Sequence, residues 1–468
     1  MVKAFHPPRK PRKQKNNTQL ATIELSIDAL DHEGVGVARQ HSPIAFVSGA
    51  LPQEHCLVEV IDRKKNFMKT RVKAVLTPSP ERQTPICQHF EQCGGCQTQY
   101  VAPDVMLGHK QIAMTQLLDK LTRGAALTLD GQLPWEKPIV DVPTGYRRKA
   151  RLAVDFRREN APRIGFRGKG SGNVVDIDTC VVLKPKLQAL LTPLRELCLA
   201  LNNKRAIGHV ELLQGDAEQN NTLDDSEPLV VFRITKDLPQ QDLSALKAFG
   251  SHHGCSVALE SKNKGIELLT GVGANIGYHL PQGIRIQAGA NDFIQVNPAV
   301  NRQMVSTALS WLAVKEDDRI IDLFCGLGNF SLPMASKAEK VIGIEGVPEM
   351  VQKASENAQS NGIHNTEFFC RDLDEPEALK KWQQSGINKV VLDPSRIGAK
   401  NVMSQIVELK PEKILYVSCN PATFGRDIAS LVESGEKKKP KYQLSKIAIL
   451  DMFPYTAHTE VIALFERR

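Results

Sequence analysis

From about residue 293 to the end of the chain, short apolar runs alternate with segments of helical spacing, and this alternation constrains the fold more than any other feature of the sequence. Such a pattern predicts a doubly wound sheet, in which helices connect parallel strands. The last two apolar runs, 447–453 and 461–465, are separated by only seven residues. Seven residues are too few for a crossover helix, so we expect these two strands to pair antiparallel.

Two of the runs end on residues that carry chemistry. Cys419, in the sequence S-C-N-P, directly follows the apolar run 414–417, and Asp393 and Arg396, in the sequence D-P-S-R, follow the run 390–392. The carboxyl ends of parallel strands meet at one edge of a sheet, where such sheets bind their ligands. The position of Cys419 therefore favours a nucleophile. A buried thiol without reactivity is the alternative interpretation.

A third strand, at residues 320–324, breaks into a glycine turn at residues 325–329, as nucleotide-type cofactors require. The turn lacks the full G-x-G-x-x-G spacing, which disfavours a dinucleotide-dependent dehydrogenase. Glu345 and Asp372, at the ends of later strands, can accept hydrogen bonds from a ribose and from an adenine edge. An ordinary α/β domain with capped turns is the alternative. Together these features resemble the S-adenosylmethionine methyltransferase fold.

Three cysteines within ten residues, Cys87, Cys93 and Cys96, predict a metal site. The two glycines of the sequence C-G-G-C let the backbone wrap closely around an ion or cluster. Cys180 is the best candidate for a fourth thiol, and four thiolates suit either zinc or an iron–sulfur cluster. The five-residue gap between the first two cysteines favours [4Fe-4S] with a structural or RNA-contacting role, and chance clustering is the alternative.

The chain before the doubly wound domain divides into three predicted parts. These are a basic, disordered tail at residues 1–17, a small all-β barrel at residues 18–80, and a central α+β domain at residues 81–292 that carries the cysteines. The doubly wound domain then comprises residues 293–468. In the central domain a polar stretch, residues 215–227, is interpreted as an exposed loop.

The formal net charge of +8 favours a polyanionic partner. In the most basic stretch, aromatic rings interleave with cations, so that a surface could follow phosphates while its rings stack on bases. A solvated sheet face is the alternative. The cations are Arg147, Arg148, Lys149, Arg151, Arg157, Arg158, Arg163, Arg167 and Lys169, and the rings are Tyr146, Phe156 and Phe166.

No apolar run approaches the roughly twenty residues that span a bilayer. The basic N-terminus is not followed by the apolar stretch of an export signal. We therefore expect a cytoplasmic protein without a membrane partner.

Nearly the whole chain resembles the RNA uracil-C5 methyltransferases, and the resemblance rests on the TRAM-like barrel, the four-cysteine cluster, the glycine turn, S-C-N-P and an F-x-Q-V-N segment at residues 293–297. It implies that Cys419 adds to uracil C6 and that Glu460, with His458 as the fallback, removes the C5 proton. The D-P-S-R sequence departs from the D-P-P-R expected in the family but keeps both charged residues. The resemblance also implies S-adenosylmethionine contacts at Gln295, Phe324, Asn329, Glu345, Asp372 and Asp393, and [4Fe-4S] ligands at Cys87, Cys93, Cys96 and Cys180.

Within this family, a tRNA enzyme is expected to lack the barrel and the cluster, so their presence favours 23S rRNA as the substrate. A relative that methylates a different rRNA or tRNA uridine is the alternative. A non-catalytic iron–sulfur RNA-binding protein is the alternative from another class, but it has no need for Cys419 or Glu460. No obligate protein partner is evident in the sequence, so we expect a monomer.

Overall fold

The computed structural model describes residues 21–122, 132–156, 163–219, 222–432 and 441–468. The described chain forms two compact units, one of the residues up to Asp31 with Val35–Arg82, the other of His32–Gly34 with the residues from Gln83 to Arg468. The predicted basic tail at residues 1–17 and the two basic residues Arg157 and Arg158 lie outside the described residues.

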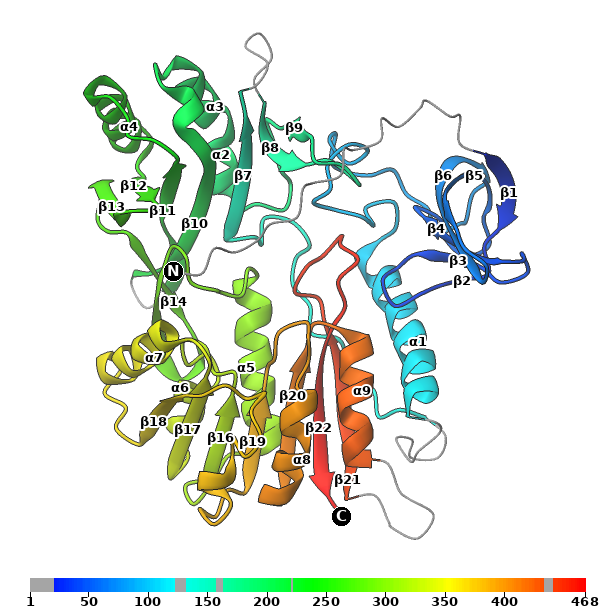
Figure 1. Ribbon diagram of the computed structural model, residues 1–468, viewed down its shortest axis with the longest axis vertical. Coiled ribbons are helices and arrows are strands. Elements are labelled where there is room, and N and C mark those ends of the chain that lie inside the picture. The colour runs from blue at the N-terminus through cyan, green and yellow to red at the C-terminus, as the bar shows by residue number, and fades with distance from the viewer. Residues whose placement is uncertain (1–20, 123–131, 157–162, 220–221, 433–440) are drawn as a thin grey trace, which may run out of the picture. The chain divides into compact units, whose positions relative to one another are not determined.

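The first unit is a six-stranded sheet with the strand order β1-β5-β6-β4-β3-β2 (Figure 1). Alternate side chains along its strands point to one side and bury Leu25, Val47, Cys56, Val58 and Met68 in a small core. The all-β interpretation of this segment is therefore confirmed. The strands are β1 (Thr22–Ser26), β2 (Ala29–Leu30), β3 (Gly36–Ala38), β4 (Ile44–Ser48), β5 (His55–Arg63) and β6 (Phe67–Thr77).

The middle of the chain forms a seven-stranded sheet with the order β13-β12-β11-β10-β7-β8-β9. Its strands are β7 (Lys149–Asp155), β8 (Arg163–Arg167), β9 (Val174–Asp176), β10 (Ile207–Gln219), β11 (Thr222–Ile234), β12 (Ser256–Ser261) and β13 (Gly265–Thr270). Helices α1 (Pro103–Leu121), α2 (Pro185–Ala189), α3 (Leu191–Ala200) and α4 (Gln240–His253) and the hairpin of β14 (Asn275–His279) and β15 (Arg285–Gly289) complete this part.

The interpretation of residues 215–227 as an exposed loop is wrong. The described residues of this stretch belong to the long hairpin of β10 and β11. Asp216 is buried there, because the Arg302 side chain lies 3.4 Å from its carboxylate and His279 donates a backbone hydrogen bond to it. Partners that lie far away in the sequence thus allow a polar segment to enter a sheet.

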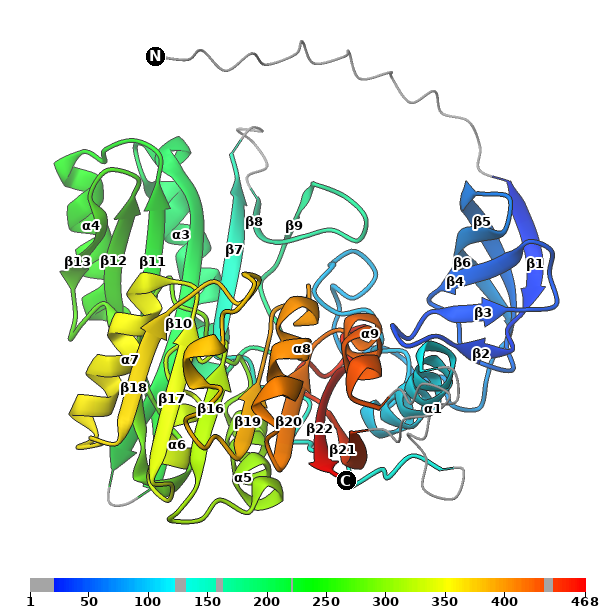
Figure 2. The same ribbon diagram turned by 60° about the horizontal axis from the view of Figure 1, so that its bottom comes forward.

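The C-terminal part is a second seven-stranded sheet, with the order β18-β17-β16-β19-β20-β22-β21 (Figures 1 and 2). The five strands β18, β17, β16, β19 and β20, in this order across the sheet, pair parallel with their neighbours. Strand β22 pairs antiparallel with β20 and with β21. The predicted doubly wound sheet and its antiparallel final pair are therefore confirmed. The strands are β16 (Arg319–Leu323), β17 (Lys340–Glu345), β18 (Thr366–Cys370), β19 (Lys389–Leu392), β20 (Lys413–Ser418), β21 (Tyr442–Leu450) and β22 (Glu460–Arg467).

Helices cover both faces of this sheet. Along β20, Leu415 belongs to the core that contains Met304 of α5, whereas Tyr416 belongs to the core that contains Phe424 of α9. A strand that is buried on both faces is apolar throughout, which explains the continuous apolar runs in the sequence. The helices are α5 (Pro298–Leu312), α6 (Ser331–Ala335), α7 (Pro348–Ser360), α8 (Lys400–Leu409) and α9 (Pro421–Val432).

The two sheets of the second unit share hydrophobic core. Leu213 and Val231 of the middle sheet lie in the same core as Met304. Met114 and Leu118 of α1 lie in the same core as Phe424. None of the helices in the described segments is both long and apolar enough to span a membrane.

Candidate active site

The parallel strands β16, β19 and β20 bring three predicted site segments to one edge of the sheet. The last residue of β16 pairs with the last residue of β19, which pairs in turn with Tyr416 of β20. Phe324 and Asp393 therefore follow their strands side by side, and Cys419 lies three residues beyond Tyr416.

Cys419 and Glu460 come together through the antiparallel pairing of β20 with β22. The last pair in this ladder is Ser418 with Val461, so Cys419 directly follows β20 and Glu460 begins β22 at the same end of the ladder. The two groups are close enough for Glu460 to raise the pKa of the Cys419 thiol. Cys419 is partly buried and Glu460 is 7% exposed, whereas His458, the fallback base, is exposed.

The surroundings of this pair favour the neutral forms of both groups. Burial, with Glu460 and Asp393 nearby, raises the pKa of the Cys419 thiol to about 11, and Arg396 opposes this rise. Burial and Asp393 raise the pKa of Glu460 to about 8, whereas Arg396 and Lys110 lower it. Both groups would therefore ionise more readily if positive charge were added to the site.

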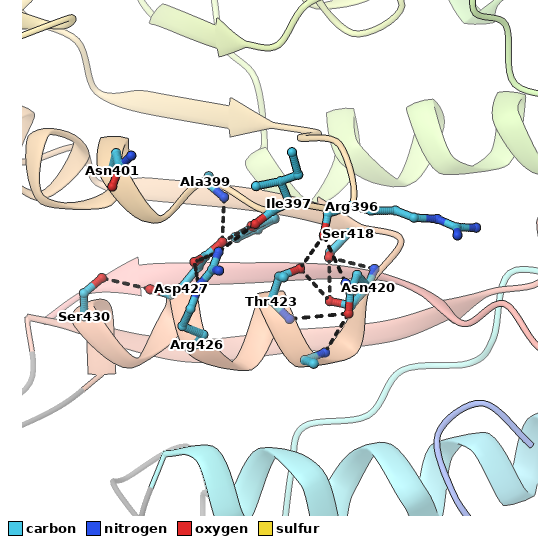
Figure 3. A network of polar contacts seen from close by, with 12 residues as sticks. Arg396, Ile397, Ala399, Asn401, Ser418, Asn420, Thr423, Arg426, Asp427 and Ser430 are labelled. Atoms are coloured by element: carbon cyan, nitrogen blue, oxygen red, sulfur yellow. Dashed lines mark hydrogen bonds and ion pairs between the residues drawn. The ribbon is translucent and has the colours of Figure 1, made fainter. Parts of the chain in front are cut away.

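Asn420 connects the nucleophile segment to the D-P-S-R loop (Figure 3). Its Oδ1 accepts hydrogen bonds from the backbone N–H groups of Ala422 at 3.1 Å and Thr423 at 3.4 Å, and thereby caps α9. Its Nδ2 donates to the carbonyl oxygen of Arg396 at 3.0 Å. Cys419 is therefore held between the end of a buried strand and a capped helix start.

Asp427, further along α9, holds the end of the same loop (Figure 3). Its buried carboxylate accepts hydrogen bonds from the backbone N–H of Ala399 at 2.6 Å and from the Tyr416 hydroxyl at 2.8 Å. Arg426 pairs with this carboxylate at 2.7 Å and also donates to the carbonyl oxygen of Ile397 at 2.8 Å. The helix that follows Cys419 therefore also fixes the backbone of the D-P-S-R loop.

The glycine turn after β16 contains left-handed backbone at three positions. Phe324, Gly326 and Gly328 have φ angles of 63°, 55° and 93°. Such an angle is uncommon in a bulky residue like Phe324, and strained positions of this kind cluster at ligand sites. The N–H of Gly326 donates to the Glu345 carboxylate at 3.2 Å, so the turn is fastened to the end of β17.

The buried Asp322 and the partly buried Asp393 lie beside this turn. Burial raises the pKa of both Asp322 and Asp393 to about 7. The Ser331 hydroxyl donates to one oxygen of Asp322, while the other oxygen is buried without a hydrogen-bond partner. A buried, unsatisfied carboxylate oxygen suits a ligand that brings hydrogen-bond donors or positive charge.

The remaining predicted cofactor residues lie on segments that reach the same sheet. Asp372 follows β18, and its Oδ1 accepts a hydrogen bond from the backbone N–H of Asp374 at 2.9 Å. Asn329 exchanges two hydrogen bonds of 3.0 Å with Asn301 of α5. Gln295 lies just before α5. The six predicted contacts thus come from the segments at the ends of β15, β16, β17, β18 and β19.

Two charged residues near Glu460 were missed in the sequence analysis. Lys110 of α1 is buried, and its Nζ donates to the carbonyl oxygens of Thr456 at 3.0 Å and His458 at 2.6 Å. Asp451, directly after β21, is also buried; burial raises its pKa to about 6, and Lys110 opposes this rise. Lys110 precedes His458 by 348 positions, so no local pattern connects it to the site. The only sequence signal is a lysine among the apolar residues of a helix.

The four predicted cluster ligands, Cys87, Cys93, Cys96 and Cys180, line one cavity of about 90 Å³. Burial, with the neighbouring thiols, raises the pKa of Cys96 to about 12 and that of Cys180 to about 11. Within the described ranges, no three cysteine, histidine or acidic side chains are arranged to hold a metal ion. The structure thus gathers the four thiols around a cavity rather than around one point.

The described residues of the basic stretch do not form one continuous outward surface. Arg148 is 1% exposed, and its guanidinium lies 5.1 Å from the centre of the Tyr278 ring. Lys149 donates to two backbone carbonyls of the segment before α5. Tyr146 and Phe156 are buried, so they are not available to stack on bases. Among the cations of this stretch that the structure describes, Arg151, Arg167 and Lys169 are exposed.

Comparisons with known proteins place this site in a family. The family model described as tRNA (Uracil-5-)-methyltransferase matches residues 281–468. The protein named 23S rRNA (uracil(1939)-C(5))-methyltransferase RlmD from Klebsiella pneumoniae (strain 342) is 41% identical over 447 residues, which cover 95% of this chain and 96% of that protein. The chain belongs to the RNA uracil-C5 methyltransferase family. A second uracil-C5 methyltransferase, RlmD of Salmonella typhimurium (strain LT2), is 41% identical over 445 residues, with the same coverage.

A solved structure has the same overall fold as this uracil-C5 methyltransferase chain. The Pyrococcus abyssi tRNA (uracil-54, C5)-methyltransferase, in complex with S-adenosyl-L-homocysteine, aligns with a TM-score of 0.70 and 22% identity, covering 94% of this chain and 99% of that one. The likeness confirms a mixed α/β chain with a C-terminal methyltransferase fold. Because a tRNA enzyme spans nearly the whole chain, the expectation that tRNA enzymes lack the N-terminal parts is not general.

Proposed function

We propose that this chain is an S-adenosylmethionine-dependent methyltransferase that forms 5-methyluridine in 23S rRNA through a covalent adduct of Cys419. The 41% identity to RlmD enzymes over nearly the full length supports the reaction and the substrate. The observation that carries the proposal is the position of Cys419 and Glu460 beside the last pair of the β20–β22 ladder, where Glu460 raises the pKa of the Cys419 thiol, at the sheet edge that also carries Asp322 and Asp393.

The chain supplies a nucleophile and a base for this reaction. Uracil C5 is not nucleophilic enough to take a methyl group unaided. Cys419 adds as a thiolate to C6, which moves electrons toward C5 and the C4 carbonyl, and C5 then takes the methyl group. Glu460 accepts the proton that leaves C5. The electrons of the broken C5–H bond restore the C5–C6 double bond, and the thiolate of Cys419 is expelled.

The residues around the glycine turn fit S-adenosylmethionine, which supplies a methyl group on a positively charged sulfur when bound. The unsatisfied oxygen of Asp322 and the partly buried carboxyl group of Asp393 are suited to that charge. A cation near Cys419 and Glu460 also favours the ionised form of each. We assign the cofactor contacts to Gln295, Phe324, Asn329, Glu345, Asp372 and Asp393.

The donor set of the cysteine cavity supports a [4Fe-4S] cluster. The four thiols that line the cavity are the ligands that such clusters use. The five-residue gap between Cys87 and Cys93 differs from the short cysteine pairs of zinc ribbons and favours the cluster. We assign Cys87, Cys93, Cys96 and Cys180 as the ligands, with a structural role.

The remaining assignments follow from the family and the reaction. We assign residues 18–80 to a TRAM-like barrel, residues 81–292 to a central cluster-bearing domain and residues 293–468 to the methyltransferase domain. An enzyme that modifies ribosomal RNA works where ribosomes are assembled, which supports a cytoplasmic location. The nucleophile, the base and the cofactor contacts all come from one chain, which supports a monomer.

Methyl transfer to unmodified 23S rRNA tests the proposed function. Wild-type protein with methyl-labelled S-adenosylmethionine should produce 5-methyluridine, at the uridine equivalent to position 1939 in the names of the relatives. Cys419→Ala should produce none. A methyl group at another rRNA uridine or in tRNA would favour a differently directed member of the family. RNA binding without any methyl transfer would favour the non-catalytic alternative.

A further inference from the structure

Lys110 lies on α1, outside the methyltransferase sheet, and we propose that it is a positioning residue for the base: it holds the backbone that leads into Glu460 and supplies the positive charge that this buried carboxylate needs. The inference rests on the proposed function, because it concerns the proton transfer to Glu460. Lys110 is not among the residues that the family resemblance assigns to the site.

The geometry connects Lys110 to the segment that carries Glu460. Its Nζ donates to the carbonyl oxygens of Thr456 at 3.0 Å and His458 at 2.6 Å, which lie four and two residues before Glu460. The Lys110 side chain is 3% exposed, so solvent does not compete strongly for these donors. A movement of this ammonium group would therefore move the backbone segment that carries Glu460.

Helix α1 is a rigid support for this contact because it packs closely on α9. A Cβ at Gly425 of α9 would lie 2.4 Å from Cδ1 of Leu121, and glycine is what allows this approach. Met114 and Leu118 of α1 share a hydrophobic core with α9. Helix α9 begins directly after the nucleophile segment, so the same packing holds both Cys419 and Lys110 in place.

The charge of Lys110 acts on Glu460 and not only on the two carbonyls. The charged and titratable groups around Glu460 come from three elements in addition to its own: Asp393 and Arg396 after β19, Cys419 after β20, and Lys110. Burial lowers the pKa of Lys110 to about 8, and Asp451 and Glu460 oppose this fall. A buried ammonium is costly unless anions compensate it, and the carboxylates of Glu460 and Asp451 are the groups that do so. A neutral donor would have satisfied the carbonyls at lower cost.

The pH profile of single-turnover methyl transfer separates this role from a merely structural one. Lys110→Gln keeps an amide donor but removes the charge. The pH at which the rate is half-maximal should then rise by about one unit, so that the rate at pH 7 falls roughly tenfold and recovers at higher pH. The apparent KM for RNA should not change. Lys110→Arg should restore the wild-type profile, and Lys120→Met, at the exposed end of the same helix, should not alter it.

Each outcome bears on one proposal. Wild-type protein that transfers no methyl group overturns the proposed function. Active wild-type protein together with an unshifted profile in Lys110→Gln overturns the role of Lys110 and leaves the proposed function standing. A loss of rate that is equal at every pH also overturns it, because that result indicates a structural lysine. Thermal unfolding is measured for each variant to show that it is folded. If Lys110→Gln is unfolded, the pH profile of methyl transfer by Lys110→Met is judged by the same criteria.

Discussion

Cys419 and Glu460 each directly adjoin the last pair of the β20–β22 ladder, Ser418 with Val461, although α9 and β21 separate them along the chain. Their closeness has an electrostatic consequence. Glu460 raises the pKa of the Cys419 thiol, so the resting site disfavours a state in which both groups are ionised. We therefore expect that positive charges at the site determine when the thiolate of Cys419 forms. These charges are those of Arg396, Lys110 and the bound cofactor.

Cofactor affinity should depend on pH in a way that reflects the charge of the ligand. The pKa of Asp322 and that of Asp393 are both raised to about 7, so these acids are mostly protonated at pH 6 and mostly ionised at pH 8. S-adenosylmethionine should therefore bind more tightly at pH 8, by about three- to tenfold. Isothermal titration with S-adenosylhomocysteine, which lacks the sulfonium charge, is the matched control and should show a smaller change. An identical pH dependence for the two ligands would contradict the assignment of these acids.

Arg396→Met should slow methyl transfer by about tenfold at pH 7.5, because the loss of this cation raises the pKa of both Cys419 and Glu460. The rate should recover as the pH rises toward 9, where more of each group is ionised. Rapid-quench kinetics at saturating RNA measure this, and Arg396→Lys, which keeps the charge, is the control. A defect of the same size at every pH would mean that Arg396 acts by contact rather than by charge.

Asp427→Asn should weaken the attachment of the D-P-S-R loop. The substitution turns one of the two carboxylate oxygens into an NH2 donor and removes the charge, so either the Ala399 N–H and the Tyr416 hydroxyl or the Arg426 guanidinium lose their acceptor, and the free energy of unfolding should fall by about 1–3 kcal/mol. Methyl transfer should also slow, because the loop carries Asp393 and Arg396. Denaturant unfolding and turnover are compared with Asp317→Asn, an exposed acid. Unchanged turnover in a destabilised Asp427→Asn protein would show that the loop does not depend on this carboxylate.

Anaerobically purified protein should be coloured and should contain four irons and four sulfides per chain. The broad visible absorption of thiolate-bound iron should be lost in Cys180→Ser, because Cys180 lines the cavity with the other three cysteines. Cys198→Ser is the control, since Cys198 is buried elsewhere in the middle sheet's core. A colourless protein with one zinc per chain would overturn the cluster assignment.

Much of the C-terminal fold could be predicted because the central strands β17, β16, β19 and β20 are buried on both faces. Runs such as residues 414–417 are apolar without interruption, and their ends mark the edge where Asp393 and Cys419 lie. The short connection before β22 required antiparallel pairing, and that pairing brings Glu460 and Cys419 to the same end of the β20–β22 ladder.

The residues that could not be predicted depend on partners that are distant in the sequence. Asp216 enters a strand because Arg302 compensates its charge, and Arg148 turns inward onto Tyr278 instead of facing solvent. Lys110 reaches the base segment only because α1 packs on α9. The local sequence pattern does not indicate such pairs, because each charged residue by itself resembles an ordinary surface residue.

The central claim is that Cys419 forms a covalent bond with uracil and that Glu460 is needed to release it. The most direct measurement is denaturing gel electrophoresis and mass spectrometry of Glu460→Gln protein incubated with S-adenosylmethionine and a 23S rRNA fragment. We expect a slowly migrating protein–RNA adduct that carries the methyl group and maps to the peptide containing Cys419, and none when Cys419→Ala is combined with Glu460→Gln. Undiminished release of methylated RNA by Glu460→Gln, or an adduct that persists without Cys419, would contradict the account.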